Sequence, residues 1–149
     1  MRNNKKNLRT SIILLIICIL IIIFNIYAFI IGPHLQEEKI INKYKESLIF
    51  QHNKPIEYYS TYSLDNIIYT YYDDNNYYLI NKDLNKQNVI KKDTINLNKF
   101  IEENNIKEYD IKFGYTNDIY VIALVTKDIE YIFNLDTKEY LYEYKRNEI

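Results

Sequence analysis

A run of 21 uncharged residues dominates the hydropathy pattern of the chain. The run extends from Ser11 to Ile31 and reads SIILLIICILIIIFNIYAFII. A helix of this length spans about 31 Å, which matches the roughly 30 Å thickness of the hydrocarbon core of a bilayer. Because a single segment in lipid can satisfy its backbone hydrogen bonds only as a helix, the pattern predicts a transmembrane helix over residues 11–31.

Beyond Gly32 the pattern becomes amphipathic. Pro33 fits the first turn of a helix, where its missing N–H group is not needed. Apolar residues then recur at helical spacing, at Ile40, Ile41, Tyr44 and Leu48, which predicts an amphipathic helix of about four turns. The segment His52-Asn53-Lys54-Pro55 is expected to end it. We expect its apolar stripe to pack on a sheet, and a partner helix near the membrane is the other interpretation.

The rest of the chain alternates with the period of two that is typical of strands. Segments rich in Asp and Asn separate these strands, since both residues tolerate tight and left-handed turns. A short helix interrupts them, with Asn96 as its expected N-cap, Ile95 and Phe100 as a hydrophobic staple, and Asn104-Asn105 as its end. The expected strands are residues 56–62, 66–72, 77–81 and 88–91 before this helix, and 109–115, 119–125, 131–135 and 140–144 after it. Residues 119–125 are apolar on both faces, which predicts a central strand.

The two halves of this region repeat one pattern, a helix followed by up to four antiparallel strands. Tyr78 to Asp83 and Tyr131 to Asp136 lie at corresponding places, about 53 residues apart. Each half has only about 55 residues and is too small to be robust alone, so we expect the halves to share an interface. The expected fold class is α+β: a transmembrane helix, then units over residues 33–92 and 93–149, each a helix packed on a three- or four-stranded antiparallel sheet.

Charges beside the apolar run predict its orientation. Basic residues precede it with no acidic residue among them, at Arg2, Lys5, Lys6 and Arg9, whereas the segment after it carries mixed charges. By the positive-inside rule, residues 1–10 form a cytoplasmic basic tail and the C-terminal domain lies outside the cell. The run is longer than the core of a signal peptide and lacks small residues at its exit, so we expect an uncleaved anchor in the cell membrane. The net charge of −1 and the lack of a basic stripe give no case for nucleic-acid binding.

The sequence offers no constellation for catalysis or metal binding. The single cysteine, Cys18, lies in the apolar run, so the region beyond the run has no disulfide and no cysteine metal ligand. The bulky Ile17 before it does not fit lipoprotein acylation. His34 and His52 lack metal-ligand spacing, and Asp73-Asp74 lacks the rest of a calcium loop. No G-x-S-x-G or S-x-x-K motif occurs. We therefore expect no enzyme activity, no cofactor and no metal. A wall-active enzyme is kept as a hypothesis behind the two binding functions described below.

Tyrosine supplies the candidate binding surface. The chain has 17 tyrosines, nearly all on expected strands, where the ring is half buried while the hydroxyl reaches water. Most are expected to be structural, but two small cores cannot hide them all. The excess gives a rigid amphipathic surface that suits a protein partner or a glycan strand. The last strand, with Tyr140, Tyr142 and Tyr144 expected on one face, is the best candidate.

Residues Tyr131 to Leu141, YIFNLDTKEYL, resemble the closing hairpin of the TseB-like (YpmB-like) cell wall elongation regulators of low-GC Gram-positive bacteria. In that family a strand ends in Asp-x-x-Gly before the final strand, and this sequence departs from the pattern, because Asp136 is followed by Thr137, Lys138 and Glu139 with no glycine. Ile95 to Ile106 looks like the helix that opens the second unit of the family. The layout of basic tail, single membrane helix and two helix-plus-sheet units is also similar.

The resemblance implies two tandem cystatin-like units related to the PepSY module, and it implies no catalysis. The expected function is therefore that of a non-enzymatic, membrane-anchored regulator of peptidoglycan elongation. Its expected partners are the membrane and a penicillin-binding protein or another extracytoplasmic membrane protein. The alternative is a PepSY-like inhibitor or sensor module that modulates an extracytoplasmic protease or a sensor kinase.

Overall fold

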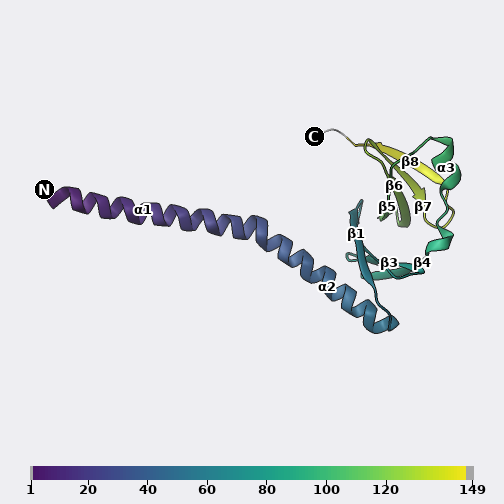
Figure 1. Cartoon of the computed structure of the whole chain (residues 1–149), viewed down its shortest axis with the longest axis horizontal. Helices are drawn as coiled ribbons and strands as arrows, with labels where there is room; N and C mark the ends of the chain where they lie inside the picture. Colours follow the sequence, from purple (N-terminus) through teal and green to yellow (C-terminus); the bar gives the residue numbers. More distant parts are fainter. Residues whose placement is uncertain (1, 147–149) are drawn as a thin grey trace. The chain divides into compact units, whose positions relative to one another are not determined.

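The computed structural model describes residues 2–146 and divides into two compact units between Lys43 and Tyr44. The first unit is helical, and the second contains two four-stranded antiparallel sheets (Figure 1). The chain is therefore α+β, as the hydrophobic pattern predicts. Met1 of the expected basic tail and residues 147–149 of the expected second helix-and-sheet unit lie outside the described range.

A continuous helical segment forms the first unit. Helix α1 (Arg2–Ile26) leads into a π-helix, η1 (Tyr27–Ile31), and then into helix α2 (Gly32–His52), whose last turns belong to the second unit. Among the described residues, one helix is long and apolar enough to cross a membrane, and it contains the apolar run from Ile12 onward. The structure thus supports the expected candidate membrane span.

Pro33 does not interrupt the helix, because the π-helix precedes it. Proline has no N–H group to donate, and its ring clashes with the carbonyl one turn earlier in a regular α-helix. In η1 the Gly32 N–H group donates to the Tyr27 carbonyl oxygen, five residues back, so the turn is wider than in an α-helix. A Cβ atom at Gly32 would lie 3.1 Å from that oxygen, so glycine suits this tight position.

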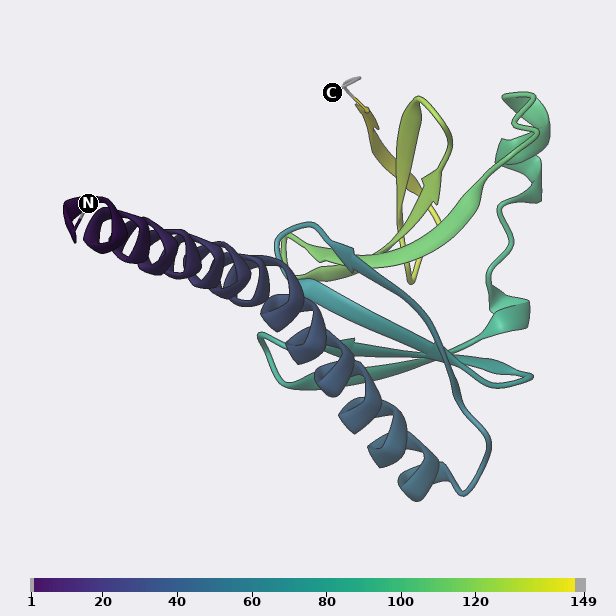
Figure 2. The ribbon, with the colours of Figure 1, turned by 60° about the vertical axis from the view of Figure 1, so that its left-hand side comes forward.

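The first sheet is a meander of four strands that follow α2. Its strands are β1 (Glu57–Ser63), β2 (Ile67–Tyr72), β3 (Asn76–Asn81) and β4 (Lys86–Lys91), paired in the order β1-β2-β3-β4 (Figure 2). Helix α2 ends where expected, since Asn53 takes a left-handed φ of 50° and its N–H group donates to the Ile49 carbonyl oxygen at 2.8 Å. Leu48 of the last turns of α2 is buried, and the Tyr44 ring lies 5.8 Å from that of Tyr69 on β2.

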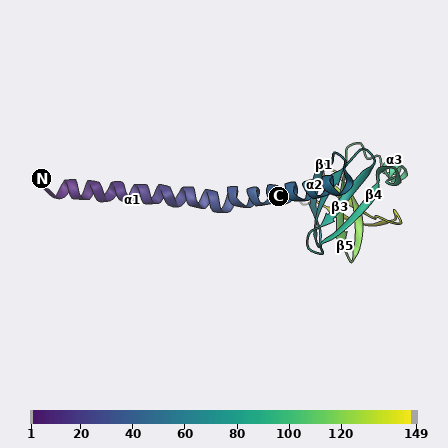
Figure 3. The ribbon, with the colours of Figure 1, turned by 90° about the horizontal axis from the view of Figure 1, so that it is seen from below.

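The second sheet has the same meander order, β5-β6-β7-β8, and Figure 3 shows its first strand, β5. It follows a 3-10 turn, η2 (Lys92–Thr94), and a short helix, α3 (Asn98–Glu103). Its strands are β5 (Asp110–Thr116), β6 (Ile119–Val125), β7 (Ile129–Asn134) and β8 (Tyr140–Lys145). The prediction of a central strand over residues 119–125 is confirmed, because β6 has a neighbour on each side and its last five residues are buried.

Helix α3 ends at the predicted asparagines, but its N-cap differs from the predicted residue. Leu97, not Asn96, is the N-cap, since its carbonyl oxygen accepts the first helical hydrogen bond, from the Ile101 N–H group at 3.0 Å. The Asn96 side chain does accept a bond from the Asn98 N–H group at 3.1 Å. At the other end, Asn105 has a φ of 53°. The Ile106 N–H group donates to the Ile101 carbonyl oxygen and the Asn105 N–H group to that of Glu102, which is a Schellman motif.

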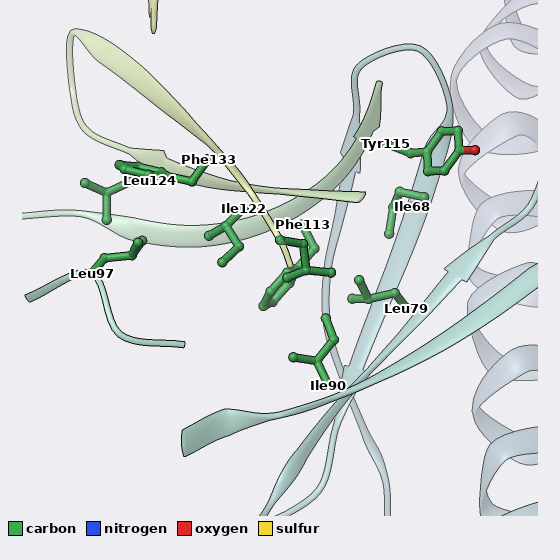
Figure 4. Close-up of a cluster of buried hydrophobic side chains, with 10 residues drawn as sticks. Ile68, Leu79, Ile90, Leu97, Phe113, Tyr115, Ile122, Leu124 and Phe133 are labelled. Atoms are coloured by element: carbon green, nitrogen blue, oxygen red, sulfur yellow. The ribbon is translucent and has the colours of Figure 1, made fainter. Parts of the chain in front are cut away.

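The two sheets share one hydrophobic core, which Figure 4 shows. The first sheet contributes Ile68, Leu79 and Ile90, and the second contributes Phe113, Tyr115, Ile122, Leu124 and Phe133. The opposite face of β6 forms a second cluster, of Val121, Ala123 and Val125, against which Tyr62 and Leu64 of the first sheet's hairpin pack. Both faces of β6 are therefore covered, which explains its continuous apolar sequence.

Polar contacts also join β1 and its hairpin to the second sheet. The Asp65 N–H group donates to the Tyr115 carbonyl oxygen at 3.2 Å, and the Tyr62 hydroxyl donates to Glu130 Oε2 at 2.6 Å. A Cβ atom at Gly114 would lie 2.9 Å from Leu64 Cδ1. Glycine therefore lets β5 approach the β1–β2 hairpin closely.

Candidate functional site

The predicted tyrosines on β8 do not share one face of the sheet. Tyr142 pairs with Ile132 and Tyr140 pairs with Phe133, and the register shifts between Ile132 and Phe133. Since consecutive residues of a strand point to opposite faces, this bulge directs Tyr140 to the side opposite Tyr142. The expectation that Tyr140, Tyr142 and Tyr144 lie on one face is wrong for this reason.

Each face of β8 nevertheless carries a half-exposed tyrosine beside another aromatic ring. The Tyr140 ring stacks on that of Phe100 with centroids 5.7 Å apart, and its exposed fraction is 46%. On the other face, the Tyr144 ring meets that of Tyr142 at 5.2 Å, and Tyr142 packs on the Val121 cluster. These two separate positions replace the single predicted surface.

A larger tyrosine surface lies on the first sheet, where three Tyr-Tyr pairs follow one another in adjacent strands. The register aligns Tyr58 with Tyr71, Tyr71 with Tyr78, and Tyr72 with Tyr77. One row, Tyr58, Tyr71 and Tyr78, is buried except at Tyr58. The other row consists of Tyr59, Tyr72 and Tyr77, which we call the Tyr59 row.

A β-bulge brings Tyr59 into its row. The β1–β2 register shifts between Tyr58 and Ser60, so Tyr59 is the extra residue that such a bulge inserts. Its ring centroid lies 6.1 Å from that of Tyr72 and 5.4 Å from that of Tyr77. The Tyr77 ring in turn lies 4.9 Å from that of Phe113. The Tyr59 row is therefore a partly exposed aromatic surface anchored on the shared core.

A cation covers part of the Tyr59 row. Lys92 Nζ lies 4.6 Å from the ring centroid of Tyr72 and 5.3 Å from that of Tyr77, within the range of cation–π attraction. Burial raises the pKa of Tyr59, and the nearby Tyr77 and Asp110 raise it further. Burial and Tyr72 likewise raise the pKa of Tyr77. These phenols therefore stay neutral at physiological pH and can both donate and accept hydrogen bonds.

A hollow of about 200 Å³ adjoins Tyr59 between β1 and β5. Its lining consists of Tyr59, Ser60, Asp110, Ile111 and Lys112. The Ser60 hydroxyl oxygen is buried and has no hydrogen-bond partner within the described part of the chain. This volume is below the ~300–1,000 Å³ of small-molecule pockets, so the hollow suits one protruding side chain or sugar ring of a larger partner.

The histidines and carboxylates singled out in the sequence do not assemble into a reactive site. Across residues 2–146 no group of three or more His, Cys, Asp or Glu side chains could hold a metal ion. His34 is exposed, and the His52 ring lies 4.8 Å from that of Tyr78. Asp73 is buried in the β2–β3 turn and accepts hydrogen bonds from the Asn75 and Asn76 N–H groups and the Tyr78 hydroxyl. Of these residues, His52 and Asp73 therefore make structural contacts.

Comparisons of the chain with protein-family models, curated proteins and solved structures find no match.

The sequence did carry a signal for the Tyr59 row. Its three tyrosine pairs are visible as YY at residues 58–59, 71–72 and 77–78. A strand places the two members of each pair on opposite faces, so a half-exposed row was foreseeable. The alignment of the pairs depends on the strand register and on the bulge at Tyr59, neither of which hydrophobic alternation reveals.

Proposed function

We propose that this chain is a non-enzymatic, membrane-anchored extracytoplasmic regulator of peptidoglycan elongation that acts by binding a penicillin-binding protein. Three features support the proposal. The apolar helix suits a single-pass anchor with a cytoplasmic N-terminus, given the basic residues that precede it. The layout of the chain resembles the TseB-like regulators, and the second unit presents a surface suited to binding.

The finer fold assignment belongs to the same proposal. We propose that each sheet, with the helix that precedes it, is a cystatin-like unit related to the PepSY module. Each four-stranded meander follows a helix, α2 or α3. The Phe100 ring of α3 lies 4.8 Å from that of Phe133 on β7, which is the kind of contact that a helix packed on a sheet makes.

The main support for a binding role is the partly exposed Tyr59 row. Tyrosine is enriched at the centres of protein interfaces, because its ring buries much apolar area while its hydroxyl keeps a hydrogen bond. The anchoring of Tyr77 on Phe113 reduces the conformational entropy lost on binding. Lys92 adds a charged group beside the rings, and an acidic group of a partner can pair with it.

Affinity purification of the tagged, full-length chain from membranes tests this function. We expect mass spectrometry to identify a penicillin-binding protein among the recovered proteins. The substitution Tyr59→Ala should lower that recovery at least fivefold, since truncating an energetically important interface residue costs more than ~1 kcal/mol. Recovery of only a protease or a sensor kinase would replace the proposal with the PepSY-like inhibitor or sensor.

Tyr58→Ala is the matched control for this experiment. Tyr58 is the neighbouring residue on the same strand, and its exposed fraction is 36% against 38% for Tyr59. Its ring, however, faces Tyr71 in the other row, 5.7 Å away. Recovery of the partner should therefore survive Tyr58→Ala, and equal losses in the two variants would show that the Tyr59 row is not the binding surface.

A further inference from the structure

Asn25 is a polar side chain within the apolar part of α1. Its Nδ2 group donates to the carbonyl oxygen of Ile21 at 2.7 Å. Within the described residues, no hydrogen bond to its Oδ1 atom is found, and the residue is exposed on the helix surface. A bilayer core has no water to pair with such a carbonyl oxygen, so leaving it unpaired there is unfavourable.

The residues that share a helix face with Asn25 follow from the heptad spacing of the sequence. A step of seven residues returns to nearly the same face of a helix, with a drift of about 20°. Cys18 lies seven residues before Asn25, and Leu14, Ile21 and Ala28 complete the seam. Cys18 and Asn25 thus occupy the a positions of a heptad. Two small residues lie on this seam, Ala28 next to Asn25 and Cys18 one heptad before it, and small residues permit the close approach of another helix.

We propose that two copies of this chain associate in the membrane through this face, with the two Asn25 carboxamides hydrogen bonded to each other. A carboxamide contains both a donor and an acceptor, so two of them satisfy each other reciprocally. Copies inserted in the same orientation place Asn25 at the same depth, whereas an unrelated helix would need its own polar group there. A single polar residue at an a position also fixes the register of two packed helices.

This association goes beyond the proposed binding of a wall-synthesis protein and does not depend on it. The second unit of each copy would be confined beside that of the other. Such pairing raises the effective concentration of any surface that the two units present, including the Tyr59 row.

Oxidative cross-linking of the full-length protein in membranes tests the association, with Cys18 as the reporter. Cys18 is the only cysteine of the chain, and it lies on the proposed seam, so no engineered thiol is needed. Treatment with copper phenanthroline should give a disulfide-linked dimer on a non-reducing gel. Absence of that dimer would overturn the proposal.

Substitutions at Asn25 distinguish dimerisation through its carboxamide from random collisions of two helices in the membrane. Asn25→Leu keeps a similar size and removes the carboxamide, and it should weaken dimerisation roughly threefold to twentyfold. Asn25→Gln keeps the carboxamide and should retain most of the cross-linking. If Asn25→Leu cross-links as well as the unmodified chain, the Asn25 pair is not what holds the helices together.

The opposite face of the helix provides a geometric control. Residue 16 lies nine positions from Asn25, about half a turn away at ~100° per residue. The double variant Cys18→Ser with Ile16→Cys moves the thiol to that face and should give at most a tenth of the cross-linked dimer. An equal yield from the two thiol positions would indicate unspecific contact and would contradict the proposed seam.

Discussion

The backbone turns of this protein depend on asparagine where many proteins use glycine. Neither of the two glycines of the chain has a positive φ, whereas six other described residues do: Asn53, Asn85, Asn105, Asn117, Asp118 and Lys138. Asn and Asp tolerate the left-handed region because their short side chains can bond locally. Lys138 also takes a left-handed φ, of 62°, although this conformation is less common for lysine than for Asn or Asp.

Replacement of Lys138 by glycine is therefore expected to stabilise the protein. The left-handed conformation costs a residue with a Cβ atom roughly 1–2 kcal/mol, and glycine loses roughly 0.5–1 kcal/mol more through chain entropy on folding. Lys138→Gly should therefore raise the free energy of unfolding by roughly 0.5–1 kcal/mol. The Lys138 ammonium group also bonds the Leu135 carbonyl oxygen. Lys138→Ala is the control that loses this bond but keeps the strain, and denaturant unfolding of the variants measures both effects. Equal stability of the Gly and Ala variants would argue against strain at this residue.

At the scale of the elements, the sequence predicts their order and type but not their irregularities. The pattern of apolar residues locates all eight strands. Residues 119–125 are apolar on both faces, which identifies β6 as a central strand. The sequence does not reveal the bulges at Tyr59 and beside Phe133, because their positions depend on packing against other elements. Tyr140, for example, is positioned by the ring of Phe100, a long-range contact. The π-helix before Pro33 was likewise hidden, since a proline on its own signals a helix boundary.

The free energy of unfolding should fall at acid pH, because Asp73 stabilises the β2–β3 hairpin as a carboxylate. Burial raises the pKa of Asp73, but hydrogen bonds from Tyr78, Asn75 and Asn76 outweigh it and lower the pKa to about 2, from 3.8. Because the pKa is lower in the folded state, the stabilisation is present above pH ~4 and is lost as the pH falls toward 2. The expected loss is about 1 kcal/mol by pH 3 and about 2 kcal/mol by pH 2.

Urea unfolding across this pH range measures the contribution. Asp73→Asn removes the titrating group and keeps an oxygen acceptor at the turn, so its stability should fall less between pH 6 and pH 3 than that of the unmodified protein. Parallel pH profiles of the two proteins would mean that Asp73 does not stabilise the hairpin as a carboxylate.

At the scale of the whole molecule, the two sheets share an interface, as expected for two halves that are each too small to be robust alone. The β1–β2 hairpin reaches the second sheet through Leu64 beside Gly114 and through the bond from Tyr62 to Glu130. The sequence alone does not pair these residues, because they are about 50 to 70 positions apart. The Tyr59 row depends on the same packing, since Phe113 supports Tyr77 from the second sheet.

We propose that the second unit binds a protein of wall synthesis outside the cytoplasm while the apolar helix holds it in the membrane. Photo-crosslinking in living cells tests this most directly, with a photoreactive phenylalanine analogue in place of Tyr59 in the full-length chain. We predict a cross-link from this position to a penicillin-binding protein, and none from the same analogue in place of Tyr58. A protease or sensor kinase at position 59, or the same products from both positions, would contradict the account.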